Sequence, residues 1–207
     1  MIKNLIFDFG KVLVDYDYFF IIDRIFSTHA RALDFYTRLM GDKWTERFDR
    51  EDIPFDSIIG QMQQAMPQYA AEIAQFALHY NDFVLGEVAG MRRLLTEKKA
   101  EGYKLYGLSN WCSKVYHTMA KYPIFSLLDG RVISSEDKII KPEPKIYALL
   151  CDRYSLRPDE SVFTDDVEAN VEAARRFGLH AIQFKNAGQY ESDLRAILSR
   201  EGALPRP

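Results

Sequence analysis

Cysteine is scarce in this sequence, which contains only Cys112 and Cys151. Two cysteines are too few for a disulfide framework, and no Cys-x-x-Cys or Cys/His cluster offers a zinc site. Long apolar runs are also missing, because the stretch after Met1 is broken by Asp8 and is far shorter than a signal-peptide core or a membrane span. We therefore expect reduced, packed thiols in a cytoplasmic protein.

The sequence also has no excess of basic over acidic residues. Lysine and arginine together number 27 against 30 aspartates and glutamates, which gives a formal net charge of −3. Such a chain has no basic field for a polyphosphate backbone, so neither nucleic acid nor a membrane is an expected partner. A small phosphorylated metabolite fits better, with the protein acting as a monomer or weak homodimer.

The 207 residues, of which 47% are hydrophobic, can bury a full α/β core and leave residues for a smaller unit. Three segments share one layout, in which a short apolar run ends in small polar or acidic residues. They are Leu5-Ile6-Phe7 before Asp8, Lys104 to Leu108 before Ser109-Asn110, and Ser161-Val162-Phe163 before Thr164-Asp165-Asp166. As parallel strands, these runs would bring their polar ends to one crevice.

Strand and helix patterns alternate along the rest of the chain. Strands are predicted over 129–134 and 179–184, and helices over 88–100, 113–121, 143–154, 167–177 and 189–199. This alternation is typical of an α/β fold with a doubly wound, mostly parallel, Rossmann-like sheet.

Between about Tyr16 and Gly86 the apolar residues recur at helical spacing, and no strand signal interrupts them. A helical insert of this length is far longer than a βα crossover needs. We therefore predict a catalytic core formed by residues 1–15 and 87–207, and a helical cap formed by residues 16–86 over the crevice.

Four short motifs follow one another at the predicted strand ends and in the loop between them. They are Asp8-Phe9-Gly10-Lys11-Val12-Leu13-Val14-Asp15, Ser109-Asn110, Lys141-Pro142 and Asp165-Asp166. In order and spacing they resemble the four motifs of the haloacid dehalogenase-like (HAD) hydrolase superfamily. The Asp-x-Gly start and the Asp-Asp pair followed by Asn170 resemble, within it, the helical-cap bacterial sugar phosphatases of the α-D-glucose-1-phosphate phosphatase type.

The residue types suit attack by a carboxylate on a phosphate ester. Such an attack splits a difficult hydrolysis into two displacements, but a positive counterweight is needed because a carboxylate repels a phosphate dianion. Mg²⁺ would supply it, since this ion binds oxygen ligands and commonly takes one or two carboxylates. The resemblance implies Asp8, the carbonyl of Gly10 and Asp166 as its ligands, with Asp165 in support.

The resemblance also implies a phosphate clamp. Lys141 would neutralise the nucleophile Asp8 and the transferring phosphoryl oxygens, and Ser109 and Asn110 would hold the phosphate. Together these features predict a Mg²⁺-dependent phosphatase that hydrolyses a small phosphomonoester, such as a sugar phosphate, through an aspartyl-phosphate intermediate on Asp8.

The sequence departs from the family pattern at one chemically important position. Most phosphatases of this family carry a second aspartate two residues after the nucleophile, as the acid that protonates the leaving oxygen, and here that position is Gly10. Loss of such a group typically lowers a rate by ~10²–10⁴-fold. Asp15, Asp17 or a cap residue could substitute. Lys11 likewise replaces a usual glycine.

Substrate choice is expected to reside in the cap. Trp44, Arg47 and Asp49 are candidates for contact with a polar, sugar-like leaving group, although an exposed charged helix face with one packed indole explains the same pattern.

Three other functions fit parts of the pattern. A metal-free haloacid dehalogenase would not need the acidic pair Asp165-Asp166. A phosphomutase or phosphotransferase would pass the phosphoryl group to a second hydroxyl, and a non-catalytic regulatory member of the fold would explain Gly10.

Overall fold

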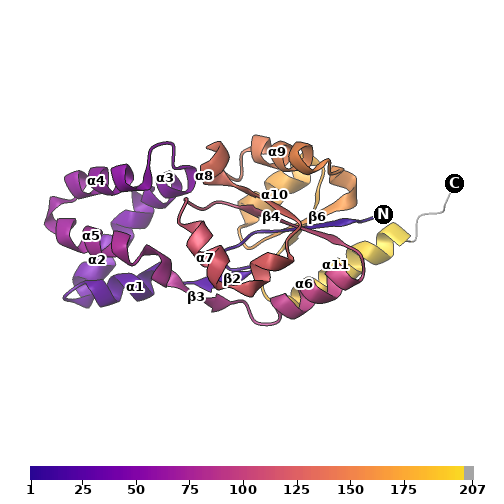
Figure 1. Ribbon diagram of the computed structural model, residues 1–207, viewed down its shortest axis with the longest axis horizontal. Helices are drawn as coiled ribbons and strands as arrows, with labels where there is room; N and C mark the ends of the chain where they lie inside the picture. Colours follow the sequence, from indigo (N-terminus) through magenta and orange to yellow (C-terminus); the bar gives the residue numbers. More distant parts are fainter. Residues whose placement is uncertain (203–207) are drawn as a thin grey trace.

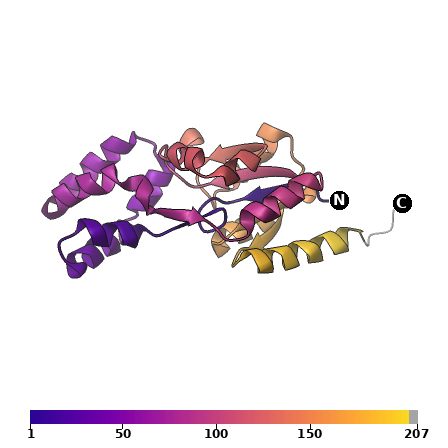
Figure 2. The ribbon, with the colours of Figure 1, turned by 60° about the horizontal axis from the view of Figure 1, so that its bottom comes forward.

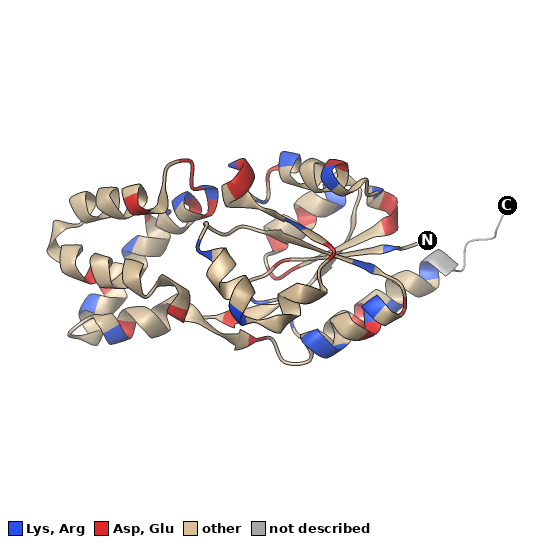
Figure 3. Cartoon of the chain, viewed as in Figure 1, with Lys and Arg blue, Asp and Glu red and all other residues tan. Residues whose placement is uncertain are grey.

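The computed structural model describes residues 1–202, which form an α/β part and an all-helical part along the long axis of the molecule (Figure 1). Figure 3 shows acidic and basic residues interspersed over both parts. Within residues 1–202, no helix combines the length and the apolar character needed to cross a lipid bilayer.

The α/β part is built on a parallel sheet with the strand order β5-β4-β1-β6-β7. Its strands are β1 (Asn4–Phe7), β4 (Lys104–Ser109), β5 (Gly130–Ile133), β6 (Ser161–Asp165) and β7 (His180–Gln183). The predicted apolar runs therefore form buried strands, and the three with polar ends lie side by side at the centre. The expected doubly wound α/β fold is confirmed.

Helices cover both faces of the sheet (Figure 1). One face carries α6 (Met91–Ala100) and α11 (Ala187–Gly202), and the other carries α9 (Pro144–Tyr154) and α10 (Glu168–Phe177). Alternate residues of β1 pack on opposite faces of the sheet, since Leu5 and Phe7 belong to one apolar cluster and Ile6 to the other. The predicted helices are observed with slightly shifted ends; α6, expected from residue 88, begins only after Gly90, which has a left-handed φ of 86°.

The helical part leaves the sheet after β1. Its helices are α1 (Tyr18–Ile25), α2 (His29–Gly41), α3 (Trp44–Arg50), α4 (Phe55–Ala65) and α5 (Ala70–Leu78). The prediction of no strand over residues 16–86 is wrong at both margins, because β2 (Val14–Tyr16) pairs antiparallel with β3 (Val84–Glu87) where the chain leaves and returns. Strands of three and four residues leave little periodic signal. Figure 2 shows β3 between the two parts.

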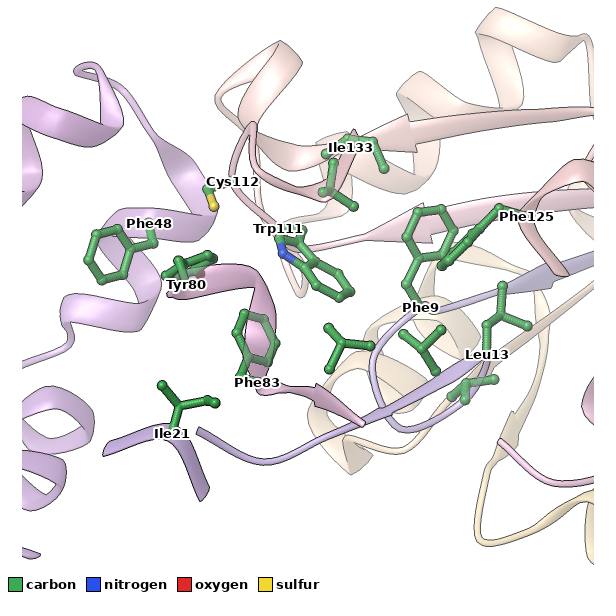
Figure 4. Packing of buried hydrophobic residues seen from close by; sticks show 14 of the residues in the cluster. Phe9, Leu13, Ile21, Phe48, Tyr80, Phe83, Trp111, Cys112, Phe125 and Ile133 are labelled. Atoms are coloured by element: carbon green, nitrogen blue, oxygen red, sulfur yellow. The ribbon is translucent and has the colours of Figure 1, made fainter. Parts of the chain in front are cut away.

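Buried aromatic rings form a continuous path between the helical part and the sheet (Figure 4). The ring of Phe48 lies 5.6 Å from that of Tyr80, and Tyr80 lies 5.1 Å from Phe83. Phe83 in turn stacks on Trp111, in the loop after β4, at 5.7 Å. The two parts therefore share one apolar core, which holds the helices over the carboxyl ends of the strands.

Candidate active site

The three polar strand ends meet at one edge of the sheet. Asp8 follows β1 and donates its backbone N–H to the carbonyl of Thr164 in β6 at 2.9 Å. Asn110 follows β4 on the other side of β1, and Asp166 follows β6. Because parallel strands end at the same edge, residues more than 150 positions apart in sequence surround one point.

A tight turn after Asp8 fixes the position of residue 10. The N–H groups of Leu13 and Val14 both donate to the carbonyl of Phe9 at 2.9 Å, and Lys11 adopts a left-handed φ of 60°. A Cβ atom added to Gly10 would lie 2.7 Å from Cε1 of Tyr16. Glycine is required here because the ring of Tyr16 fills the space that a side chain would need.

The ammonium group of Lys141 lies between two carboxylates. Its Nζ lies 2.8 Å from Oδ1 of Asp8 and donates to Oδ2 of Asp165 at 2.7 Å, and the side chain is buried. Asn110 holds the Lys141 backbone in place: its Oδ1 accepts from Lys141 N–H at 2.8 Å and its Nδ2 donates to the Lys141 carbonyl at 3.0 Å. The Asn110 side chain thus positions the lysine, and the second N–H of its amide group is not used in these two contacts.

Asp165 is fully buried and its carboxylate is engaged from several sides. Besides Lys141, Oδ1 accepts from Val167 N–H at 2.8 Å, and Nδ2 of Asn170 lies 3.1 Å from both oxygens. Charge-assisted hydrogen bonds of this kind fix a carboxylate in one orientation. Asp165 therefore orients Lys141, and Asn170 holds Asp165.

Three carboxylate groups lie close enough together for their oxygen atoms to bind one hard cation. One oxygen each from Asp8, Asp165 and Asp166 lie within 4.8 Å of one another, and Gly10 lines the same cavity as Asp8 and Asp166. Burial raises the pKa of Asp8 to about 7, against the opposing effect of Lys141, and the charges of Asp165 and Asp166 raise it further. Burial and Asp165 also raise the pKa of Asp166. The residues fit Mg²⁺, because a divalent cation relieves this crowding of negative charge.

A cavity of about 190 Å³ opens between the strand ends and the helical part. Residues from both parts line it: Asp8, Gly10, Tyr16, Tyr18, Met40, Thr45, Asp49, Phe83, Asn110, Trp111, Lys141, Asp166, Val167 and Asn170. Its aromatic walls come from residues that the sequence analysis did not single out, since aromatic residues at helical spacing indicate a core as readily as a binding surface. A lining that combines polar groups with aromatic rings suits a small phosphorylated molecule.

Ser109 is the last residue of β4 and precedes Asn110, which lines this cavity. Its side chain is buried, and its Oγ has no hydrogen-bond partner within the described part of the chain. A buried hydroxyl without a partner is costly, so this atom is well suited to a ligand oxygen.

The structure does not bring Trp44 and Arg47 to the cavity, which corrects the expectation from sequence. The indole of Trp44 is buried, and the guanidinium of Arg47 lies 4.7 Å over it and donates to Gln61. Asp49, the third candidate from the sequence, does line the cavity, and Thr45, which was not a candidate, lines it too. Residues four apart share one face of a helix, so α3 presents Thr45 and Asp49 to the site and turns Trp44 away from it.

A model of haloacid dehalogenase-like hydrolases matches residues 2–178, and the chain belongs to this family. It is 26% identical to a sesquiterpene phosphatase (astK) of Aspergillus oryzae over 95% of this chain and 96% of that protein. It is 24% identical to a D-ribitol-5-phosphate phosphatase of Bacteroides thetaiotaomicron over 96% of this chain and 100% of that protein.

A solved HAD family enzyme of Bacteroides thetaiotaomicron, in complex with magnesium and inorganic phosphate, shares the fold with a TM-score of 0.72. It is 24% identical, and the match covers 90% of this chain and 96% of that one. The family resemblance inferred from the four motifs is therefore confirmed, and the chain is a hydrolase of the HAD fold.

Proposed function

We propose that this protein is a Mg²⁺-dependent phosphatase that hydrolyses a small phosphomonoester, such as a sugar phosphate, through an aspartyl-phosphate intermediate on Asp8. The observation that carries the proposal is the buried Lys141 ammonium, 2.8 Å from Asp8 and 2.7 Å from Asp165, beside Asp166. Relatives whose names describe phosphatases, one of them acting on a sugar-alcohol phosphate, support it.

In the first step a carboxylate oxygen of Asp8 attacks phosphorus and the ester oxygen departs. Lys141 balances charge on Asp8 and on the phosphoryl oxygens, and the Ser109 hydroxyl and Asn110 hold the phosphate. Asp8, Asp166 and the Gly10 carbonyl would hold Mg²⁺, which supplies positive charge to the acidic cluster and the phosphate when bound. In the second step water attacks the same phosphorus and releases Asp8.

The division into a catalytic core (1–15 and 87–207) and a cap (16–86) is part of this proposal, with the cap selecting the leaving group. The cytoplasmic location and the monomer or weak homodimer state remain predictions from the sequence.

An assay of purified protein with Mg²⁺ and a panel of sugar phosphates tests the proposal. Asp8→Asn should lower turnover by more than about 10³-fold, since the nucleophile is lost, and chelation of Mg²⁺ should abolish wild-type activity. Asp152→Asn, the same substitution at an exposed position of α9, is the matched control and should keep full activity. Equal rates for Asp8→Asn and wild type, or hydrolysis that survives exhaustive chelation, would refute the proposal.

A further inference from the structure

The site described so far lacks a proton for the leaving group. When the bond between phosphorus and an alkyl oxygen breaks, the departing oxygen is strongly basic and needs a proton from a positioned acid. Gly10 has no side chain to supply one, and the ring of Tyr16 occupies the space where one would lie. Lys141 is held by two carboxylates and is the cation of the site rather than its acid.

Two acidic residues near the nucleophile in sequence are otherwise engaged. Oδ1 of Asp15 accepts from Lys11 Nζ at 2.6 Å, and its side chain is half exposed. Asp17 caps the start of α1 by accepting from the N–H groups of Phe19 and Phe20. Neither residue lines the cavity of Asp8. The substitutes nearest in sequence are therefore excluded by where their carboxylates lie.

Asp49 on α3 is the acidic residue of the helical part that lines this cavity. It is half-buried, and within residues 1–202 no hydrogen bond or ion pair engages its carboxylate. Its cavity neighbours include Asp8, Lys141 and Tyr16. A carboxyl group that lines the same cavity as the nucleophile, and that no hydrogen bond or ion pair in the described part of the chain uses, is available to a substrate.

Contacts with the core hold this stretch of α3 over the site. Ser134 Oγ donates to the Asp49 carbonyl, and Lys138 Nζ donates to the carbonyl of Glu51. Arg50 forms an ion pair with Glu143 at 2.6 Å, two residues after Lys141. Asp49 is thereby fixed relative to Lys141 through backbone and side-chain contacts on both sides of it.

The surroundings of Asp49 favour its protonated form. Burial raises the pKa of Asp49 to about 7, Lys141 opposes this shift, and the negative charges of Asp8 and Glu46 add to it. The other titratable groups whose charges interact with it are the phenols of Tyr16, Tyr18 and Tyr80 and the thiol of Cys112. A carboxyl group in this state can both give and take a proton near neutral pH.

We propose that Asp49 is the general acid and base of the reaction, in place of the side chain that Gly10 lacks; this inference rests on the proposed phosphatase function. As Asp8 oxygen bonds to phosphorus and the phosphorus–oxygen bond to the leaving group breaks, the Asp49 carboxyl proton passes to the departing oxygen. The leaving group departs as an alcohol. The Asp49 carboxylate then takes a proton from water as the water oxygen attacks phosphorus and Asp8 is released, which restores the starting state.

Asp49→Asn tests this assignment with two esters. With the sugar phosphate that wild type hydrolyses fastest, kcat should fall by ~10²–10⁴-fold, because the alkyl oxygen leaves without a proton. With 4-nitrophenyl phosphate, whose leaving group is a stable anion, the first step should persist and the second should slow. We expect a burst of one 4-nitrophenol molecule per enzyme molecule, followed by slow turnover. Mass spectrometry should then detect the phosphorylated enzyme.

Asp56→Asn, the same substitution at an exposed position of α4 that lines neither the cavity nor its rim, is the matched control and should keep kcat within about twofold. Asp49→Glu should recover part of the activity lost in Asp49→Asn. Unchanged kcat of Asp49→Asn on the sugar phosphate, or an equal loss on both esters without a burst, would overturn the assignment while Asp8→Asn still abolishes activity. A wild-type protein without phosphatase activity would instead overturn the proposed function itself.

Discussion

The ring of Tyr16 decides which residue can occupy position 10. It packs edge-on against Tyr18 at 5.5 Å and Phe83 at 5.6 Å, so it has little freedom to turn away from Gly10. The aspartate that most phosphatases of the family carry at this position would therefore meet a ring held on several sides. The departure from the family pattern has a steric cause, which couples residue 10 to an aromatic residue of the cavity wall.

This coupling can be measured with a double-mutant cycle. Gly10→Ala should lower the free energy of unfolding by about 1–3 kcal/mol, because its Cβ forces the Tyr16 ring to shift. In a Tyr16→Ala background the same change should cost clearly less, whereas in Tyr16→Phe, which keeps the ring, it should cost as much as in wild type. Urea denaturation, with and without Gly10→Ala in each of the three backgrounds, measures these costs. An equal cost with and without the ring would contradict the steric explanation.

At the scale of elements, α3 has two different faces. Trp44 and Phe48, four residues apart, are buried in the apolar core, whereas Thr45 and Asp49 line the cavity. The sequence predicted a helix here from the spacing of its apolar residues, but that spacing did not indicate which face of the helix meets the strand ends. That choice follows from how the end of α3 is attached to the α/β part.

Glu51 contributes three side-chain hydrogen bonds to this attachment. It is buried, and its carboxylate accepts from Ser113 N–H at 2.6 Å, from Ser113 Oγ at 2.7 Å and from Phe55 N–H at 3.2 Å. It thus ties the turn between α3 and α4 to the loop after β4.

Glu51→Ala should therefore lower the free energy of unfolding by about 2–4 kcal/mol, because charge-assisted hydrogen bonds are lost and buried donors are left without partners. It should also lower kcat by displacing Asp49. Urea denaturation and the sugar phosphate assay measure the two effects. Asp52→Ala, at the exposed neighbouring position, is the control and should change stability by less than about 0.5 kcal/mol. A similar small change in both variants would show that Glu51 does not hold the helix.

At the scale of the whole molecule, closing the helical part over the strand ends concentrates negative charge in a buried space. Asp8 and Asp49 come from different parts of the chain, and the pKa of each is raised to about 7, mainly by burial. An unfolded aspartate has a pKa near 4. The folded protein therefore binds more protons than the unfolded chain between about pH 4 and 7.

It follows that, without Mg²⁺, these two groups make the free energy of unfolding fall as the pH rises from about 4 to 7. Asp49→Asn should show a shallower fall, because one of the two groups no longer titrates. Urea denaturation across this pH range tests the effect. The same slope in Asp49→Asn and wild type would contradict it.

Mg²⁺ should reverse the loss of stability above pH 7, because it binds the ionised carboxylates of the folded protein. At a concentration 100 times its Kd, a ligand of the folded state adds about 2.7 kcal/mol. We expect a clear shift of the urea midpoint with Mg²⁺ at pH 8, a smaller one at pH 5, and none in Asp166→Asn. A urea midpoint that does not change with Mg²⁺ at pH 8 would contradict the cation site.

Much of the fold could be predicted because it depends on local patterns. The runs before Asp8, Ser109 and Asp165 form parallel strands as expected, and their polar ends meet. The short β2 and β3 strands escaped prediction, since each is stabilised mainly by pairing with the other. Trp44 and Arg47 were placed on the right helix but on a face that does not reach the cavity.

The sequence by itself determined where strands and helices follow one another along the chain. It also determined which acidic and hydroxyl groups end three of the strands. These follow from hydrophobic periodicity and residue type over a few neighbours. Only the tertiary structure decided that Lys141 lies between Asp8 and Asp165, that Tyr16 fills the space beside Gly10, and that Asp49 lines the cavity of the nucleophile. Most of these contacts join distant segments, so they exist only once the helical part has packed onto the sheet.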